Sequence, residues 1–276
     1  MPSIHTVFGT SFHETFQHYL QVCFQETVKQ ADAIDLNKYL LDRMIANYQA
    51  EIGKDYVEEH FTDALALTEI WNDGCHILDW IKKRRAAYFS TKKEVFLGTE
   101  IPLFIPVADK YGNVYIVAYL DLIMYDKTFN RVRIIDIKTS TYGWRKYQKE
   151  DPIKKAQVIL YKHYFSEVFD VPLENIEVEF FIVKRKLYED LPYAQKRVQL
   201  FTPAQGKITM NKTLNALHSF IEYCFNEDGS YNLNQEYHAI SGTKEHNCKF
   251  CEFKDNEELC PVSKRIESLP DKNRND

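Results

Sequence analysis

The stretch from Val114 to Ser140, VYIVAYLDLIMYDKTFNRVRIIDIKTS, constrains the fold more than any other part of the chain. Two runs rich in β-branched and aromatic residues flank a polar turn segment, Asp126 to Asn130, and this pattern predicts a β-hairpin. Apolar residues occupy both faces of the second run. Because a strand that is apolar on both faces is usually central, we expect this strand to be buried in a sheet.

Charged residues interrupt both runs of this hairpin. Asp121 lies inside the first run, and Asp136 and Lys138 lie on one face of the second because they are two residues apart. A turn over Lys127–Asn130 sets a register that places Asp121 directly opposite Asp136, with Cβ atoms roughly 4.5–5.5 Å apart. Two buried carboxylates at that distance repel each other, and a divalent cation between them removes this penalty. The alternative is a solvated hairpin whose charges face water.

Composition limits the class of protein. The chain has 276 residues, of which 45% are hydrophobic, enough for one large domain with a sizeable core. With a net charge of −5, the chain lacks the overall positive charge that is typical of nucleic-acid-binding proteins, although short basic clusters occur. We find no apolar run long enough to span a membrane and no signal peptide. We therefore expect a cytoplasmic protein whose six cysteines are reduced thiols or metal ligands.

The segment from Gly9 to Gln25 predicts a helix. Ser11 and Glu14 match a capping box, which places Ser11 at the N-cap. An apolar stripe at helical spacing follows, and His13 falls in the first turn beside that stripe. A lone histidine in such a position is more commonly a packing or surface residue than a ligand.

The segments on either side of the hairpin have different patterns. Residues 35–90 are predicted to form two or three helices, with breaks near Glu59–Thr62 and around Asn72–Gly74. Residues 92–107 have an extended pattern, and the prolines within it indicate an edge or irregular strand. Residues 142–150 follow the hairpin as a polar loop.

A further helix is predicted to begin at Asp151-Pro152, with Asp at the N-cap and Pro at the first helical position. Gln157 and Tyr161 are four residues apart and so project together from this helix. An ordinary helix rim explains that pair as well as a function does. The expected apolar face consists of Ile153, Ala156, Leu160, Tyr164 and Val168.

The order of elements predicts a mixed α/β (α+β) fold. Strands at 176–184 and 197–201 precede a long helix that ends near Phe225. We expect one domain over residues 1–270 that includes a helical insertion and a Cys-rich tail. Within it, the insertion covers 31–90 and the tail 240–265, and residues 271–276 are expected to be frayed.

The tail contains three cysteines, Cys248, Cys251 and Cys260, within 13 residues. The C-x-x-C spacing lets two thiolates bind one metal, and the third lies within reach of the same loop. A metal centre of this kind needs a fourth ligand. The candidates are His5, Cys23, Cys75, Cys224 and His246.

Four sequence pieces, in order over residues 9–161, together resemble the PD-(D/E)XK nuclease superfamily in its RecB-like branch. They are Gly9-Thr10-Ser11-Phe12-His13 for the G-x-x-x-H helix start, Leu120-Asp121 for the first acidic position, Asp136-Ile137-Lys138 for D-x-K, and Gln157 with Tyr161 for Q-x-x-x-Y. The tail resembles the clustered cysteines of the iron–sulfur members, which include AddB-like nucleases and the CRISPR-adaptation exonucleases. Leu120 departs from the proline of the motif, and no Cys precedes His13, where those members have one.

The resemblance implies a restriction-endonuclease-like core, a central mixed sheet flanked by helices, with a site for Mg²⁺ or Mn²⁺. Asp121, Asp136, His13 and the carbonyl of Ile137 would be ligands, which suits these hard ions. Lys138 would position the attacking water and stabilise the transition state. By the same resemblance Gln157 and Tyr161 would orient the DNA strand or the lysine, Glu100 would assist through a water, and the 31–90 helices would arch over a single-strand channel. The tail would hold a [4Fe–4S] cluster or, with a histidine ligand, Zn²⁺.

The resulting expectation is a metal-dependent DNA exonuclease of recombination, repair or replication, with a phage or bacterial origin and no membrane association. Its expected partners are DNA, as single strands or duplex ends, and a recombination or replication protein. The first alternative is an endonuclease of the same fold that cuts flaps, junctions or foreign DNA. The second is a catalytically idle nuclease fold that binds DNA as a subunit. His13, Asp121, Asp136 and Lys138 are all present, which argues against the idle fold.

Overall fold

The computed structural model describes residues 3–54, 61–107, 111, 113–189, 191–249 and 251–268. The α-helices are α1 (Ile4–Gln25), α2 (Val28–Ala33), α3 (Leu36–Ile52), α4 (Ala64–Arg84), α5 (Lys146–Glu150), α6 (Pro152–Phe169) and α7 (Lys207–Cys224). The strands are β1 (Glu94–Gly98), β2 (Ile101–Pro106), β3 (Tyr115–Leu120), β4 (Leu122–Asp126), β5 (Arg131–Ser140), β6 (Ile176–Lys184), β7 (Val198–Phe201), β8 (Ala239–Ile240) and β9 (Arg265–Ile266).

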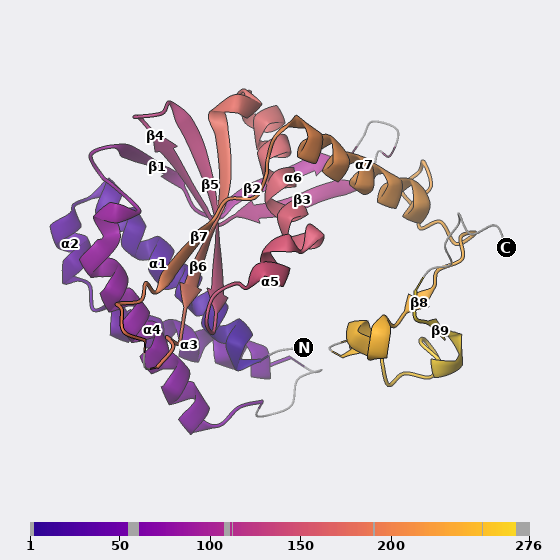
Figure 1. Ribbon diagram of the computed structural model, residues 1–276, viewed down its shortest axis with the longest axis horizontal. Coiled ribbons are helices and arrows are strands. Elements are labelled where there is room, and N and C mark those ends of the chain that lie inside the picture. Colours follow the sequence, from indigo (N-terminus) through magenta and orange to yellow (C-terminus); the bar gives the residue numbers. More distant parts are fainter. Residues whose placement is uncertain are drawn as a thin grey trace.

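A mixed sheet of five strands, in the order β1-β4-β5-β6-β7, forms the centre of the molecule (Figure 1). Strands β5 and β6 are parallel, and the other neighbours are antiparallel. Helices α1 to α4 cover one face, where Ile135 and Ile137 join their core. Helices α6 and α7 cover the other face, where Ile134 and Ile182 are buried. The predicted mixed α/β fold and the central, two-sided burial of β5 are confirmed.

The first apolar run of the hairpin is two strands rather than the single strand we expected. β4 pairs with β5 across a turn at 127–130, as predicted, but β3 pairs with β2 in a separate two-stranded ribbon. Asp121 lies at the break between β3 and β4. The ladder ends at Leu122 opposite Ile135, one residue before Asp121 and Asp136 would pair. Apolar and aromatic residues continue directly on both sides of Asp121, so the run reads as one strand and does not reveal the change of partner strand.

Helix α1 begins upstream of the predicted start. Ser3 is the N-cap and forms a capping box with Thr6, so the prediction of Ser11 as the N-cap was wrong. Ser11 is buried and donates a hydrogen bond to the Val7 carbonyl at 2.8 Å, as a serine inside a helix does. The apolar stripe extends back to Val7, which explains the earlier start. His13 therefore lies in the third turn of α1 and not in the first.

Helix α4 runs unbroken through Asn72–Gly74, where we had expected an interruption. Gly74 serves close packing instead. A Cβ atom there would lie 2.4 Å from Leu40 Cδ2 and 2.9 Å from Phe8 Cε2, so glycine lets α1, α3 and α4 approach one another. The other expected break falls between α3 and α4, and residues 59–60 of it lie outside the described residues.

Helix α6 has the predicted start, with Asp151 at the N-cap and Pro152 after it. Its predicted apolar face was wrong at both ends, because Ile153 is 81% exposed and Val168 is 48% exposed, whereas Tyr164 is buried as predicted and Leu160 packs against the same core. The buried residues are Val158, Ile159, Lys162, Tyr164 and Phe165. Hydropathy misses this face because a lysine lies on it, with its ammonium 3.2 Å from the side-chain oxygen of Gln205. The expected loop at 142–150 contains the short helix α5.

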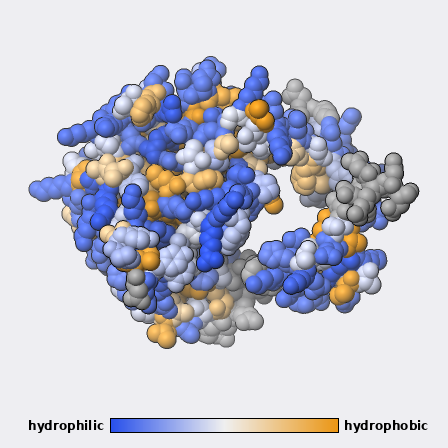
Figure 2. Space-filling model, viewed as in Figure 1, coloured by the Kyte–Doolittle hydropathy of each residue, from blue (hydrophilic) through white to orange (hydrophobic). Residues whose placement is uncertain are grey.

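The C-terminal tail forms a small unit of its own, held by the parallel pair β8 and β9 and by two short 3₁₀ helices, Thr243–Cys248 and Val262–Lys264. Figure 2 shows an opening between this mainly hydrophilic unit and the rest of the molecule. Residues 271–276, predicted to be frayed, lie outside the described residues. Among the helices of the described ranges, none has the length and apolar character that crossing a membrane requires.

Candidate active site

Three elements bring the predicted histidine and the first aspartate together. His13 comes from the middle of α1, and its Nδ1 lies 3.6 Å from Oδ2 of Asp121 at the β3–β4 break. The same Asp121 oxygen accepts a hydrogen bond of 2.7 Å from the backbone N–H of Ile137 on β5. The pairing of β4 with β5 ends at Leu122, so the backbone N–H of Ile137 on β5 has no partner from β4. The Asp121 side chain takes that place, which the backbone of a partner strand fills in a regular strand pair.

Asp136 and Lys138 share a face of β5, as predicted. Lys138 donates a hydrogen bond to Asp136 Oδ1 at 3.3 Å, and its ammonium lies 3.0 Å from Oδ2. The Asp136 side chain is only 2% exposed, and Oδ2 has no partner with hydrogen-bond geometry in spite of that short distance. A buried carboxylate oxygen without a hydrogen bond is costly, so it marks a place where a further positive or donor group fits.

The two carboxyl groups have unusual acidity. Burial raises the pKa of Asp121 and of Asp136 to about 6. The negative charge of Glu100 raises the pKa of Asp121 further, and the negative charge of Asp121 does the same for Asp136. Lys138 acts in the opposite direction on both. Burial lowers the pKa of His13, so the imidazole is neutral at neutral pH and its nitrogens are available as ligands. At neutral pH the cluster therefore presents negative carboxylates beside a neutral imidazole.

Sequence reasoning missed Gln17, which is 5% exposed and holds two parts of the cluster together. Its side-chain amide donates to Glu100 Oε1 at 2.6 Å and to the backbone carbonyl of Asp121 at 2.8 Å. Gln17 follows His13 by four residues, so both project from the same face of α1. That spacing was the available signal. Glu100, expected only as an assisting residue, thus lies in the network at the turn between β1 and β2.

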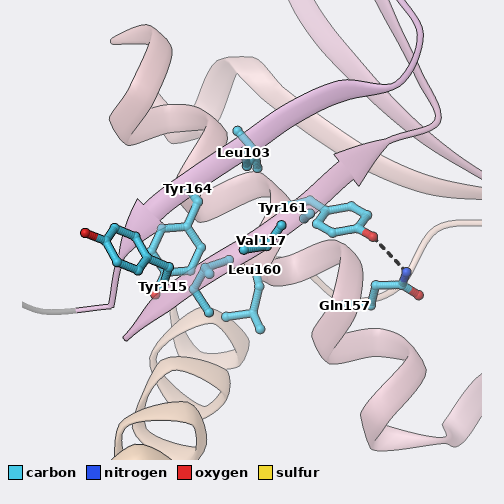
Figure 3. A pocket seen from close by; sticks show the side chains of 9 residues that line it. Leu103, Tyr115, Val117, Gln157, Leu160, Tyr161 and Tyr164 are labelled. Carbon is cyan, nitrogen blue, oxygen red and sulfur yellow. Dashed lines mark hydrogen bonds between the residues drawn. The ribbon is translucent and has the colours of Figure 1, made fainter. Parts of the chain in front are cut away.

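Helix α6 supplies the remaining pair. Gln157 donates a hydrogen bond to the hydroxyl of Tyr161 at 2.8 Å (Figure 3). Burial raises the pKa of Tyr161 to about 12, and the charges of Asp136, Asp121 and Glu100 add to this. The hydroxyl therefore stays protonated and lies within the electrostatic influence of the carboxylates. The structure thus brings all the predicted N-terminal and central site residues into one region.

A complete set of metal ligands is not preassembled. Within the described ranges, no three His, Cys, Asp or Glu side chains are close enough together to hold a metal ion. Ile137, a predicted ligand through its carbonyl, lies in the β5–β6 ladder opposite Phe181, and its N–H binds Asp121. Mg²⁺ usually keeps several waters and takes one or two carboxylates plus substrate phosphates, so an incomplete protein shell is compatible with it.

The same finding applies to the tail, where Cys248, Cys251 and Cys260 are partly buried free thiols. The N–H of Cys251 donates to the Cys248 carbonyl at 3.1 Å, so the C-x-x-C turn is formed. Two of the candidate fourth ligands, Cys23 and Cys75, are buried in α1 and α4. These helices lie on the opposite side of the molecule from β8 and β9 (Figure 1), so the fold keeps both cysteines away from the tail.

Comparison with known proteins agrees with this geometry. The family model described as PD-(D/E)XK nuclease superfamily matches residues 2–260, which is most of the chain. No curated protein matches the sequence. Nucleases of this superfamily act on DNA and generally use Mg²⁺ or a similar divalent metal. The matched range includes His13, Asp121, Asp136 and Lys138, and we conclude that the chain belongs to the PD-(D/E)XK nuclease superfamily.

Proposed function

We propose that this protein is a metal-dependent DNA exonuclease that hydrolyses phosphodiester bonds during recombination, repair or replication. The observation that carries the proposal is the partly buried cluster of His13, Asp121, Asp136 and Lys138, in which Asp136 is almost fully buried and one of its oxygens lacks a hydrogen bond. A nuclease fold without activity has no physical reason to keep two buried carboxylates with raised pKa values, because each is costly unless a cation neutralises it.

The donor set fits Mg²⁺ or Mn²⁺. Asp121 and Asp136 would supply carboxylate oxygens, His13 a neutral nitrogen and Ile137 its carbonyl, which are ligands that these ions accept. When bound, such a cation would lower the pKa of a coordinated water and offset negative charge on the scissile phosphate. Oδ2 of Asp136, which is ion-paired with Lys138 but has no hydrogen bond, is the atom whose cost of burial this binding would reduce.

Lys138 would assist the hydrolytic step directly. Water adds to phosphorus and releases one proton to solvent, the bond to the leaving oxygen breaks, and that oxygen takes up one proton. Negative charge grows on the phosphate oxygens as this happens. The Lys138 side chain is 32% exposed, so its ammonium can hydrogen-bond the attacking water or a phosphate oxygen while it remains beside Asp136. Fixed donors of this kind commonly lower the barrier by several kcal/mol, of the order of 2.7–4 for one oxyanion donor.

Gln17, Glu100, Gln157 and Tyr161 would position the cluster. Gln17 fixes the chain at Asp121 by holding its backbone carbonyl, and it links that carbonyl to Glu100. Tyr161 remains a hydrogen-bond donor at any pH at which the enzyme works, because its pKa is about 12. It can therefore orient a DNA phosphate next to the carboxylates.

The decisive test of the activity compares end-labelled linear DNA with closed circular DNA of the same sequence, each with Mn²⁺ and with EDTA. An exonuclease degrades the linear DNA in the presence of the metal and leaves the circle intact. Cleavage of the circle would show that the protein is an endonuclease and not an exonuclease. Absence of any cleavage by folded, metal-loaded protein would contradict the proposal and favour a DNA-binding subunit.

We also propose a metal centre in the tail. Cys248, Cys251 and Cys260 lie on one short segment, and His246 lines the same cavity as Cys248 and Arg265. A [4Fe–4S] cluster needs a fourth thiolate. Cys224, at the end of α7, is the remaining candidate, because Cys23 and Cys75 are buried in α1 and α4. With His246 as the fourth ligand, tetrahedral Zn²⁺ is the better match.

A further inference from the structure

A groove runs between the free edge of β3 and helix α6, directly beside the candidate active site. Its volume is about 390 Å³. Among the described residues β3 pairs only with β2, so its other edge has no partner strand. None of the nine lining residues is charged: Leu103, Tyr115, Ile116, Val117, Ala118, Gln157, Leu160, Tyr161 and Tyr164.

The two ends of this groove differ. At one end lie Gln157 and Tyr161, joined by their hydrogen bond, and toward the other end Tyr115 and Tyr164 line the groove (Figure 3). Gln157 and Tyr161 line the groove and also belong to the candidate active site. This end of the groove therefore adjoins the site.

Tyr115 forms an exposed aromatic rim. Its side chain is 41% exposed, and its ring stacks on Phe104 of β2 with centroids 4.5 Å apart and planes at 13°. Exposed aromatic pairs of this kind are uncommon on surfaces that only face water, because they leave a large apolar area uncovered. The flat, uncharged faces suit a nucleobase and do not suit a phosphate.

We propose that this groove binds one unpaired nucleobase next to the scissile phosphate, so that the enzyme acts on single-stranded DNA or on ends that have separated. The inference rests on the proposed nuclease function and specifies its substrate. A base inside a duplex is stacked and paired on both sides and cannot enter a groove of this size. Base–aromatic stacking tolerates every sequence, so the groove selects strand state rather than sequence.

The first test needs no variant. Single-stranded oligonucleotides carry one abasic residue at successive positions, and the cleavage rate at a fixed bond is measured with Mn²⁺. We expect one position next to the cleaved bond at which loss of the base lowers kcat/KM at least about fivefold, since stacking on an aromatic is worth about 1–3 kcal/mol per base. Equal rates at all positions would overturn the proposal.

The second test links that position to the groove. Tyr115→Ala should lower kcat/KM about fivefold on the intact strand and should have no further effect on the strand with the sensitive base removed. Tyr115→Phe, which keeps the ring, should restore most of the loss. Tyr119→Ala is the matched control, because Tyr119 is a 57% exposed tyrosine on the same strand that does not line the groove. An equal effect of the Tyr115 and Tyr119 variants would contradict the assignment.

Binding separates this inference from the proposed function. A single-stranded oligonucleotide with a fluorescent 2-aminopurine at the sensitive position, or at successive positions if there is no cleavage, is titrated with protein and Ca²⁺. Quenching that depends on Tyr115 supports the groove even for a protein that cuts no DNA. Cleavage without such quenching would support the proposed nuclease function and contradict the proposal that the groove binds a nucleobase.

Discussion

The candidate active site and the cysteine tail were both predicted as metal sites, and the fold treats them differently. His13, Asp121 and Asp136 are distant in sequence, yet α1, the β3–β4 break and β5 bring them together. Neither group forms a complete set of metal ligands among the described residues. The core-site side chains nevertheless contact one another or the adjoining backbone, whereas of the three tail cysteines, which lie within 13 residues, Cys248 and Cys251 are joined by a backbone turn. The first group is fixed by two hydrophobic cores, whereas the tail relies on two strands of two residues each. Closeness in sequence is thus a weaker guide to a preformed site than support by a packed core.

The strongest way to break this comparison is to remove the chemistry of the core site. We expect Asp136→Ala and Lys138→Ala each to lower cleavage by at least about 100-fold, because the first removes a metal ligand and the second a transition-state donor. The measurement is the cleavage rate of purified, folded variants with Mn²⁺. Lys38→Ala serves as the control, since Lys38 is 68% exposed and pairs only with Asp42 at the surface. Near-normal turnover of either site variant would exclude this cluster as the active site.

The pH dependence of the free energy of unfolding tests the electrostatics of the core site, which is one side of this comparison. Folding raises the pKa of Asp121 and Asp136 from 3.8 to about 6, so the folded state binds more protons than the unfolded state between these values. Without metal, this pair therefore stabilises the protein as the pH falls from about 7 to about 4, by a few kcal/mol at about 1.4 kcal/mol per pKa unit. His13 acts oppositely, because its lowered pKa costs stability as the pH falls below about 6.5.

Asp136→Asn isolates that effect. In EDTA, the variant should be more stable than the parent protein at pH 7.5, and its stability should change less between pH 7 and pH 4. Denaturant unfolding at several pH values measures both quantities. A parallel pH profile for the two proteins would show that Asp136 is not the source of the dependence.

A substitution at Gly74 tests the packing that positions His13. In Gly74→Ala the new Cβ would lie 2.4 Å from Leu40 Cδ2 and 2.9 Å from Phe8 Cε2, so we expect a loss of about 1–3 kcal/mol in the free energy of unfolding. Gly206→Ala is the matched control, because no heavy atom lies within 4 Å of its Cβ position, and the expected change is within about 1 kcal/mol. Equal stability of the two variants would mean that the helical layer tolerates the methyl group.

The smallest expected effect on cleavage belongs to the tail. Cys251→Ser should remove iron or zinc from anaerobically purified protein and should change the cleavage rate by less than about twofold, since the proposed centre is structural and stands apart from the core. Metal analysis and absorbance near 400 nm distinguish the cluster from zinc. If the parent protein prepared in this way contains no metal, both the iron–sulfur and the zinc proposals are contradicted.

Sequence patterns predicted the parts of the fold whose cause is local. Burial on both faces of β5, the Asp151-Pro152 start of α6 and the extent of β6 all follow from nearby residues. The break at Asp121 does not, because apolar and aromatic residues continue on both sides of it while the partner strand changes from β2 to β5. The role of Gln17 also depends on partners 83 and 104 residues away. No pattern within a helix can reveal such partners.

A calorimetric titration with Mn²⁺ tests the central claim most directly, because it separates metal binding from catalysis. We predict that the parent protein binds Mn²⁺ at the core site, that Asp121→Asn and Asp136→Asn each weaken this binding by about tenfold or more, and that Lys138→Ala retains it while losing activity. Unchanged Mn²⁺ affinity in both aspartate variants would contradict the assignment of this cluster as the metal-dependent centre of the nuclease.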